Sequence, residues 1–180
     1  MKKIIILSMM CLIALSVCMV ISCTRDDDET DSSMESNSGV ASDVMYVDLG
    51  LPSGTKWKIS NEENVADAEY DFFSYNDAVS KFGNSLPTKY QFEELKNECQ
   101  WTWNGSGYIV TGPNGNYIVL PAAGCRGCSG GVNLVGSYGD YWSSTPRDSD
   151  YAWGLGFYSG CVGMDNCSRC YGRSVRLVQD

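Results

Sequence analysis

Histidine is absent from all 180 residues of this chain, and this absence narrows the possible chemistry more than any other feature. Without an imidazole, the chain has no histidine acid–base catalyst, no Ser-His-Asp triad and no Cys-His nucleophile pair. Histidine-ligated metal centres are excluded for the same reason. We therefore predict no catalytic site and no cofactor.

Basic residues are also scarce, since 13 lysines and arginines face 22 aspartates and glutamates, for a formal net charge of −9. Nucleic-acid binding depends on cationic side chains that neutralise phosphates. The acidic surplus therefore argues against a nucleic-acid partner. Internal repeats are absent as well.

The first 22 residues are typical of a secretory signal. Lys2 and Lys3 precede an apolar run from Ile4 to Ile21, and Val20-Ile21-Ser22-Cys23 has the form of a lipobox. We expect cleavage before Cys23, which then carries the lipid. A single N-terminal membrane span is the alternative. Cleavage removes two lysines and no acid, which leaves 11 basic and 22 acidic residues and a net charge of −11.

Residues 23–42 are acidic and rich in serine, and they show no apolar periodicity. Such a segment cannot bury a core, so we expect a disordered tether. Its Asp26-Asp27-Asp28-Glu29 run resembles the export signal that sends Bacteroidetes lipoproteins to the outer face of the outer membrane. A plain acidic linker is the alternative. Residues 43–180 then form one domain that is large enough for a hydrophobic core.

Two helices are predicted within this domain. Ser74 can cap a helix over residues 75–82 that ends at Gly83, with Ala78, Val79 and Phe82 on its buried face. Thr88 opens a second helix, with Gln91 in the capping-box position. Its buried side is marked by the spacing of Phe92, Leu95 and Cys99.

Most of the remaining domain favours short strands and glycine-rich loops. Gly112-Pro113-Asn114-Gly115 indicates a hairpin, and a glycine-rich loop is expected over residues 127–139. Leu155 and Phe157 point the same way in an alternating strand over residues 152–159. The predicted strands cover residues 44–49, 55–57, 107–111, 116–120, 141–144, 152–159 and 174–178. This order predicts the α+β class.

The segment from Ala152 to Arg173 interleaves two kinds of residue. One set looks fixed and consists of Ala152, Leu155, Phe157, Ser159, Val162, Met164, Arg169 and Gly172. The other set holds only Gly, Tyr, Cys, Asp, Asn and Ser, all reachable from an asparagine codon by replacing adenines. It consists of Gly154, Gly156, Tyr158, Gly160, Cys161, Gly163, Asp165, Asn166, Cys167, Ser168, Cys170 and Tyr171. We interpret this interleaving as a diversified binding surface.

Several motifs along the domain resemble the Fibrobacter succinogenes major paralogous domain. The resemblance covers nearly all of residues 48–178. Its motifs are Asp48-Leu49-Gly50-Leu51-Pro52-Ser53-Gly54-Thr55-Lys56-Trp57, Leu86-Pro87-Thr88 with Phe92-Glu93-Glu94-Leu95, Leu120-Pro121-Ala122-Ala123-Gly124, Gly139-Asp140-Tyr141-Trp142-Ser143-Ser144-Thr145 and Gly172-Arg173-Ser174-Val175-Arg176.

This resemblance implies a compact C-type-lectin-like fold of the kind shared with formylglycine-generating enzymes. Within it, residues 152–171 resemble the variable proteins that retroelements diversify in gut bacteria. The implied protein is a non-catalytic lipoprotein at the outer membrane, exposed on the cell surface. Its implied partner is a protein or glycan on another cell, a phage or a host surface. Trp153 departs from the pattern, because tryptophan cannot be reached from an asparagine codon.

Candidate ligand contacts are concentrated at residues 147–171. Tyrosine is an effective contact residue because it offers a large area with few rotors and one polar tip. The predicted anchors are Tyr151, Trp153, Tyr158 and Tyr171, although these aromatics can also serve as core cover. The other predicted contacts are Arg147, Asp148, Asp150, Gly154, Gly156, Cys161, Gly163, Asp165, Asn166, Cys167, Ser168 and Cys170. Trp57, Trp101, Trp103 and Trp142 are assigned to the core.

The cysteines allow two interpretations. Cys125-Arg-Gly-Cys128 and Cys167-Ser-Arg-Cys170 have the spacing of a four-thiolate zinc site, so these four are a weak metal candidate. An exported chain favours disulfides or free thiols instead. The pairing among Cys99, Cys125, Cys128, Cys161, Cys167 and Cys170 cannot be chosen from sequence, and Cys99 fits a buried helix face.

Other functions have weaker support. A copper-dependent enzyme of the formylglycine-generating type lacks a recognisable active-site motif here, although Cys167 and Cys170 offer a cysteine pair. A calcium-dependent lectin needs more clustered oxygen ligands than Asp165 and Asn166 provide. A structural or adhesive component of a surface assembly is the third alternative.

Overall fold

The computed structural model describes residues 45–180. The predictions of a signal peptide over residues 1–22, lipidation at Cys23 and a tether over residues 23–42 lie outside these residues. Among residues 45–180, no helix is both long enough and apolar enough to cross a membrane.

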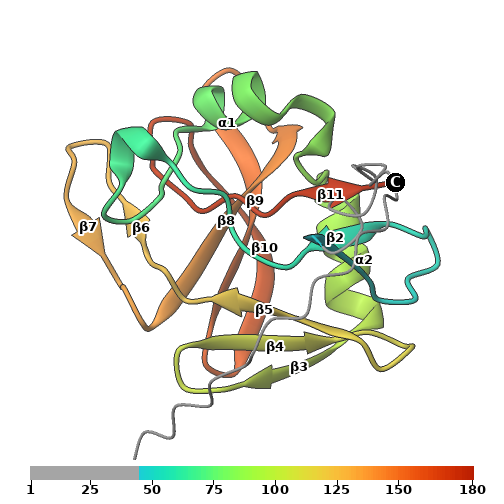
Figure 1. Cartoon of the computed structure of the whole chain (residues 1–180). Coiled ribbons are helices and arrows are strands. Elements are labelled where there is room, and N and C mark those ends of the chain that lie inside the picture. Colours follow the sequence, from blue (N-terminus) through green and yellow to red (C-terminus); the bar gives the residue numbers. More distant parts are fainter. Residues whose placement is uncertain (1–44) are drawn as a thin grey trace, which may run out of the picture. The chain divides into compact units, whose positions relative to one another are not determined.

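The described residues form two α-helices and four small antiparallel sheets, which confirms the α+β class (Figure 1). One sheet joins β1 (Tyr46–Asp48), β2 (Lys56–Lys58) and β11 (Val178–Gln179). A second joins β3 (Gln100–Trp103), β4 (Gly107–Thr111) and β5 (Tyr117–Pro121). A third pairs β6 (Cys125–Arg126) with β7 (Val132–Asn133). The fourth contains β8 (Tyr138–Pro146), β9 (Tyr151–Tyr158) and β10 (Cys161–Ser168).

Both predicted helices are confirmed with their caps. Helix α1 spans Tyr75–Phe82, and the Ser74 side chain accepts a hydrogen bond from the Asp77 amide. Helix α2 spans Lys89–Glu98, and Thr88 and Gln91 form the full capping box. These caps satisfy amide groups that have no partner within the first helical turn, which fixes where each helix begins. Short 3₁₀ turns at Val65–Asp67 and Gly83–Ser85 precede and follow α1.

The strand predictions were partly correct. The β4–β5 hairpin and β9 lie where they were expected. Strand β3 and the small β6–β7 pair were missed, and β8 is longer than predicted. The predicted strand over residues 174–178 is wrong in its extent, because regular pairing there is confined to β11. Ahead of β11, Gly172, Arg173 and Ser174 instead form isolated bridges with Arg126, Phe73 and Tyr141, and of these partners Tyr141 lies in β8.

Two hydrophobic clusters stabilise the domain. The larger contains Trp57, Phe92, Leu95 and Phe157, and the smaller contains Trp142 and Ala152 together with side chains from α1. Trp57 and Trp142 are fully buried, and Trp101 and Trp103 pack against the larger cluster. The four tryptophans assigned to the core are therefore confirmed in that role.

Both arginines of the Gly172–Arg176 motif are buried. Arg176 donates hydrogen bonds to the Asn61 side chain and to the backbone oxygens of Lys58 and Val119, at 2.9, 2.8 and 2.7 Å. It thereby ties the end of the chain to two separate sheets, because Lys58 ends β2 and Val119 lies in β5. A buried charge needs such partners to offset its desolvation. Arg173 has a different role, in the sheet that contains β8.

Candidate functional site

The β9–β10 hairpin divides the predicted contact residues between two sides of one sheet. Tyr158 faces Cys161 across the two-residue turn Ser159-Gly160, and the register continues without a shift to Tyr151 opposite Ser168. Residues that face each other in an antiparallel pair lie on the same side, and the sides alternate along each strand. The register therefore assigns a side to every residue of the hairpin.

One side, which we call the core side, carries the apolar residues of the hairpin. Leu155 and Phe157 are fully buried in the larger cluster, and Val162 and Met164 pack against it while half-buried. These four belong to the fixed-looking set of the interleaved segment, whereas Ala152 of that set lies on the opposite side. Their alternation therefore attaches the hairpin to the domain.

The other side, which we call the glycine side, carries most of the set drawn from asparagine-derived codons. Its hairpin residues are Ala152, Gly154, Gly156, Tyr158, Cys161, Gly163, Asp165 and Cys167. Strand β8 extends this side with Tyr138, Asp140 and Trp142, which face Tyr158, Gly156 and Gly154. Seven of these residues are predicted contacts, so the interleaving in sequence becomes a separation in space.

Arg173 crosses the glycine side from the edge of β8 to β10. Its Nη1 lies 2.9 Å from Asp140 Oδ1, and its two terminal nitrogens donate to the Asp165 carboxylate at 3.0 and 3.2 Å. Its guanidinium also lies 4.5 Å from the centre of the Trp142 ring. Arg173 is buried, whereas the Asp165 side chain is 39 % exposed. The buried arginine thus holds one exposed carboxylate in a fixed position.

The glycines give this side an uneven surface. A Cβ at Gly154 would lie 2.4 Å from both Arg173 Nη1 and the Tyr141 carbonyl oxygen. A Cβ at Gly156 would meet the tip of Tyr138, with its hydroxyl at 2.5 Å, whereas a Cβ at Gly163 would meet no atom within 4 Å. Gly154 therefore serves packing, and Gly163 opens onto free space.

The Asp140 carboxyl is buried, and its pKa is unusually high for an aspartate. Burial raises the pKa of its carboxyl to about 7, against a lowering by Arg173 and a further rise from Asp165. The Arg173 contact lacks the geometry of a hydrogen bond, so Asp140 Oδ1 has no hydrogen-bond partner among residues 45–180. One guanidinium between two carboxylates leaves an unbalanced negative charge, which favours a proton on the more buried acid.

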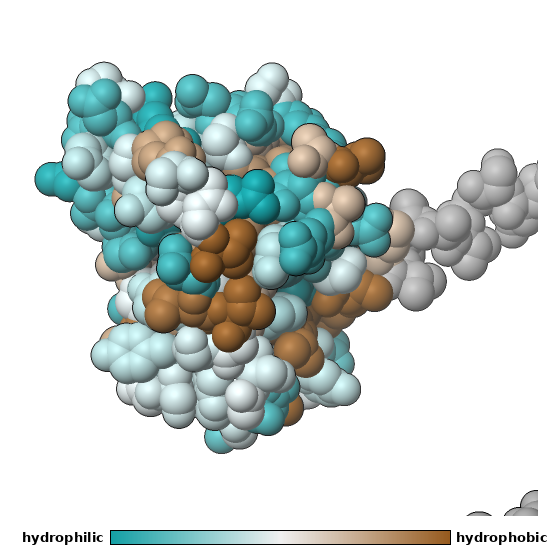
Figure 2. Space-filling model, turned by 90° about the vertical axis from the view of Figure 1, so that its left-hand side faces the viewer, coloured by the Kyte–Doolittle hydropathy of each residue, from teal (hydrophilic) through white to brown (hydrophobic). Residues whose placement is uncertain are grey.

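An apolar rim lies beside this charged group. The rings of Tyr138 and Tyr158 stack with their centres 6.2 Å apart, and Tyr158 is 52 % exposed. Leu134 and Val135, in the loop between β7 and β8, are each 56 % exposed. Figure 2 shows hydrophobic residues gathered on the side of the molecule that carries β6 and β7. The exposed aromatic ring, the open Gly163 and the fixed Asp165 carboxylate make this end of the glycine side suited to contacting a ligand.

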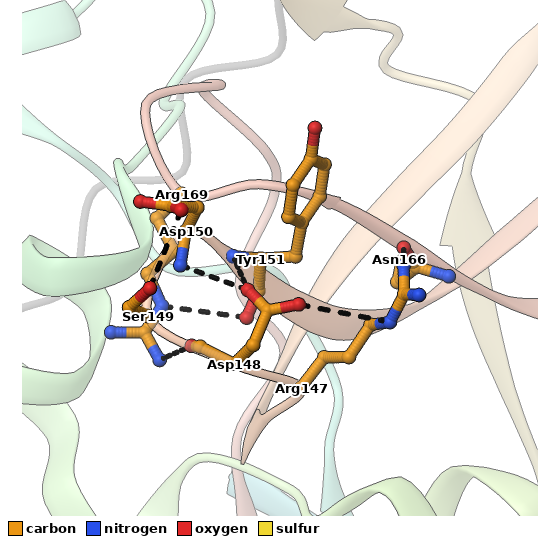
Figure 3. A network of polar contacts seen from close by, with 7 residues as sticks. All are labelled: Arg147, Asp148, Ser149, Asp150, Tyr151, Asn166 and Arg169. Atoms are coloured by element: carbon orange, nitrogen blue, oxygen red, sulfur yellow. Dashed lines mark hydrogen bonds and ion pairs between the residues drawn. The ribbon is translucent and has the colours of Figure 1, made fainter.

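A second group of predicted contacts lies at the opposite end of the hairpin (Figure 3). Asp148 accepts hydrogen bonds from the backbone amides of Asp150 and Tyr151, and these bonds lower the pKa of its carboxyl. Arg147 donates to Asn166, and Arg169 donates to the Asp148 backbone oxygen. The Tyr151 ring points away from this network, and its side chain is exposed. The polar groups here mainly bond to one another.

The remaining predicted contacts are closer to the core. Trp153 lies on the core side, half-buried, with Lys89 Nζ 4.0 Å from the centre of its ring. Tyr171 packs against the smaller hydrophobic cluster. Ser168 faces Tyr151 at the far end of the hairpin. The structure therefore does not unite the four predicted aromatic anchors, and only Tyr158 lies on the glycine side.

The six cysteines within residues 45–180 form one disulfide and four free thiols. Cys128 and Cys170 form a disulfide, whereas Cys125, Cys161 and Cys167 are free. This bond contradicts the weak candidate zinc site at Cys125, Cys128, Cys167 and Cys170, because the sulfurs of Cys128 and Cys170 are not available as thiolates. No group of three potential metal ligands exists within residues 45–180. Cys99 is half-buried against the larger cluster, and burial raises the pKa of its thiol to about 11.

Sequence reasoning missed three residues that shape the glycine side: Tyr138, Asp140 and Arg173. Asp140 and Arg173 stand within motifs that the sequence had already singled out, yet neither was assigned to the site. A signal was present, because each is a charged residue within an apolar or glycine-rich motif. No sequence pattern pointed to Tyr138, because it joins the sheet only through the early start of β8, which begins at this residue.

Comparison with known proteins gives one match. A family model described as a domain of unknown function (DUF8237) matches residues 91–178. The match runs from α2 to β11 and includes the whole glycine side. Neither the search of curated proteins nor that of solved structures finds a match.

Proposed function

We propose that this protein is a surface-displayed, non-catalytic ligand-binding protein whose binding face is diversified by a retroelement. One observation carries the proposal: most residues of the two kinds in the interleaved segment occupy different sides of the β9–β10 hairpin, although Ala152 lies on the glycine side and Asn166 on the core side. Leu155, Phe157, Val162 and Met164 attach the hairpin to the core. The residues from asparagine-derived codons mostly lie on the glycine side, where changes at Tyr158, Cys161 and Gly163 do not touch that attachment.

The chemistry of the glycine side supports recognition. Tyr158 offers an exposed aromatic ring, Asp165 offers a carboxylate held in place by Arg173, and a Cβ at Gly163 would meet no atom within 4 Å. Loops and hairpins on a rigid scaffold are common places for binding residues. The motif resemblance supports a C-type-lectin-like fold, and the lipobox with its acidic tether supports an outer-membrane lipoprotein at the cell surface. The ligand class under this proposal is a protein or glycan on another surface.

Sequencing the 3′ end of the gene and its flanks tests the origin of the diversity. We expect a nearby near-copy of the segment encoding residues 152–171 that differs only at adenines, beside a reverse-transcriptase gene. A flank without such a copy, together with identical residues in every related gene, contradicts the proposal.

A further inference from the structure

The outer edge of β10 has backbone groups without partners. Strand β10 stands at the end of its sheet and pairs only with β9. Tyr158 and Cys161 close a two-residue turn, and such a closing pair exchanges backbone hydrogen bonds. By alternation, Gly163, Asp165 and Cys167 also bond toward β9. The N–H and C=O groups of Val162, Met164 and Asn166 therefore point outward. Within residues 45–180, no backbone hydrogen bond from a turn or a loop reaches them.

This edge lacks most of the devices that usually prevent pairing and carries one charged side chain, Asp165. Natural edge strands are short, bulged, or carry lysine or proline. Strand β10 has eight residues, Cys161–Ser168, without proline, lysine or arginine, and its register with β9 has no bulge. Its residues from Val162 to Ser168 are all half-buried, so each keeps part of its surface open to solvent. Such an edge is a template for another strand.

We propose that β10 binds an extended peptide segment of a partner protein, which adds a fourth strand to the β8–β9–β10 sheet. This inference rests on the proposed function and names the ligand class. In strand addition, backbone hydrogen bonds give affinity and side chains on either face give specificity. A diversified strand suits this mode, because a change of side chain leaves the outward backbone groups unchanged.

Charge complementarity identifies the peptide further. The single charged side chain of β10 is Asp165, which is partly exposed and lies beside buried Asp140. In the part of the chain that the structure describes, Arg173 is the one cation in contact with these two carboxylates. Pairing of β10 with a second copy in the register centred on Asp165 would place the two Asp165 carboxylates opposite each other, which is unfavourable. A partner strand with a lysine or arginine on the glycine side is favoured instead.

The test uses the full chain and a displayed library of random 12-residue peptides. We expect the enriched peptides to contain β-branched residues and at least one basic residue. Amide hydrogen exchange should show Val162, Met164 and Asn166 exchanging fast in the free protein and slowly with an enriched peptide bound. Methylation of alternate peptide nitrogens should abolish binding.

A matched pair of variants separates the backbone from the side chain. Asn166→Pro removes an outward N–H, which an edge strand tolerates, and Asn166→Ala removes the same side-chain contact with Arg147 but keeps the N–H. We expect about tenfold weaker peptide binding for N166P and little change for N166A. If N166P does not fold, the exchange measurement on the unaltered chain still decides.

Two outcomes overturn the inference. One is an enriched peptide whose binding leaves the amides of Val162, Met164 and Asn166 unprotected. The other is a library that yields no binder. If a ligand requires Tyr158 for binding but leaves these amides unprotected, strand addition is wrong. The proposed ligand-binding function then still stands. If the gene has no diversified near-copy beside it, the proposed function itself is contradicted.

Discussion

At the scale of single residues, the three glycines of the hairpin differ in what a side chain would meet. Gly154 lies against a backbone oxygen and the Arg173 guanidinium, Gly156 against the flexible tip of Tyr138, and Gly163 against nothing. Sequence alone treated all three as equivalent candidates for variation. The distinction depends on how Arg173 crosses the sheet, which no local sequence pattern encodes.

Alanine substitutions at two of these glycines give a matched comparison. Gly154→Ala should lower the free energy of unfolding by about 1–3 kcal/mol, because the backbone oxygen of Tyr141 cannot move aside cheaply. Gly163→Ala should leave it unchanged or raise it by up to about 1 kcal/mol. Chemical denaturation of the full chain measures both values. Equal effects at the two positions would contradict the packing described for Arg173.

The buried carboxyl of Asp140 predicts a pH-dependent stability. Its pKa is about 7 in the folded state and 3.8 in the unfolded reference. Between these two pH values the folded state binds one more proton than the unfolded state. The contribution of Asp140 to the free energy of unfolding is therefore greatest below about pH 4 and falls as the pH rises toward 7, by at most about 1.4 kcal/mol per pH unit.

The variant Asp140→Asn cannot titrate, so its unfolding free energy should lack this contribution. The measurement is the difference between the two proteins in denaturation curves from pH 4 to pH 8. The expected difference changes with pH in this range. Parallel curves would show that the raised pKa of Asp140 does not influence folding.

At the scale of elements, helices and their caps were predictable because their signals are local. Ser74 and Thr88 bond to amides only three residues away. Strand β9 was predictable from the alternation of Leu155 and Phe157. Strand β10 was not recognised, because only Val162 and Met164 alternate within a run of small and polar residues. Its existence depends on pairing with β9, a contact that sequence spacing alone does not reveal.

The Cys128–Cys170 disulfide joins the segment that carries β6 to the segment that follows β10. The bonded cysteines are 42 residues apart, so the bond restricts a long loop in the unfolded chain. Reduction should therefore lower the free energy of unfolding by about 2–4 kcal/mol. The double variant Cys128→Ser with Cys170→Ser should match the reduced protein and not respond to reductant.

Cys161→Ser is the control for this prediction, since Cys161 is exposed and unbonded. It should retain the full response to reductant. Peptide mapping by mass spectrometry under non-reducing conditions should find Cys128 linked to Cys170. A link between Cys125 and Cys128, or between Cys167 and Cys170, would show that the pairing is wrong.

At the scale of the whole molecule, the α+β class and the burial of the central tryptophans were predictable from composition and spacing. The candidate site was predictable only in part. Sequence analysis predicted ligand contacts over residues 147–171 and assigned the anchors to one binding face. The structure divides Tyr151, Trp153, Tyr158 and Tyr171 among separate environments, because the hairpin has two sides and the chain leaves it after Ser168.

The division of the hairpin into two sides predicts where related copies differ. Gly156, Tyr158, Cys161, Gly163 and Asp165 should vary, because these positions lie on the glycine side and belong to neither hydrophobic cluster. Leu155, Phe157, Val162 and Met164 should stay constant or change only to similar apolar residues. Gly154 should remain glycine.

Sequencing this gene from many isolates of one species tests the diversified binding face most directly. The expected result is that substitutions within residues 152–171 are concentrated at the glycine-side positions and outnumber those in the rest of the domain. Substitutions spread evenly over both sides of the hairpin, or a segment that is identical in every isolate, would contradict it.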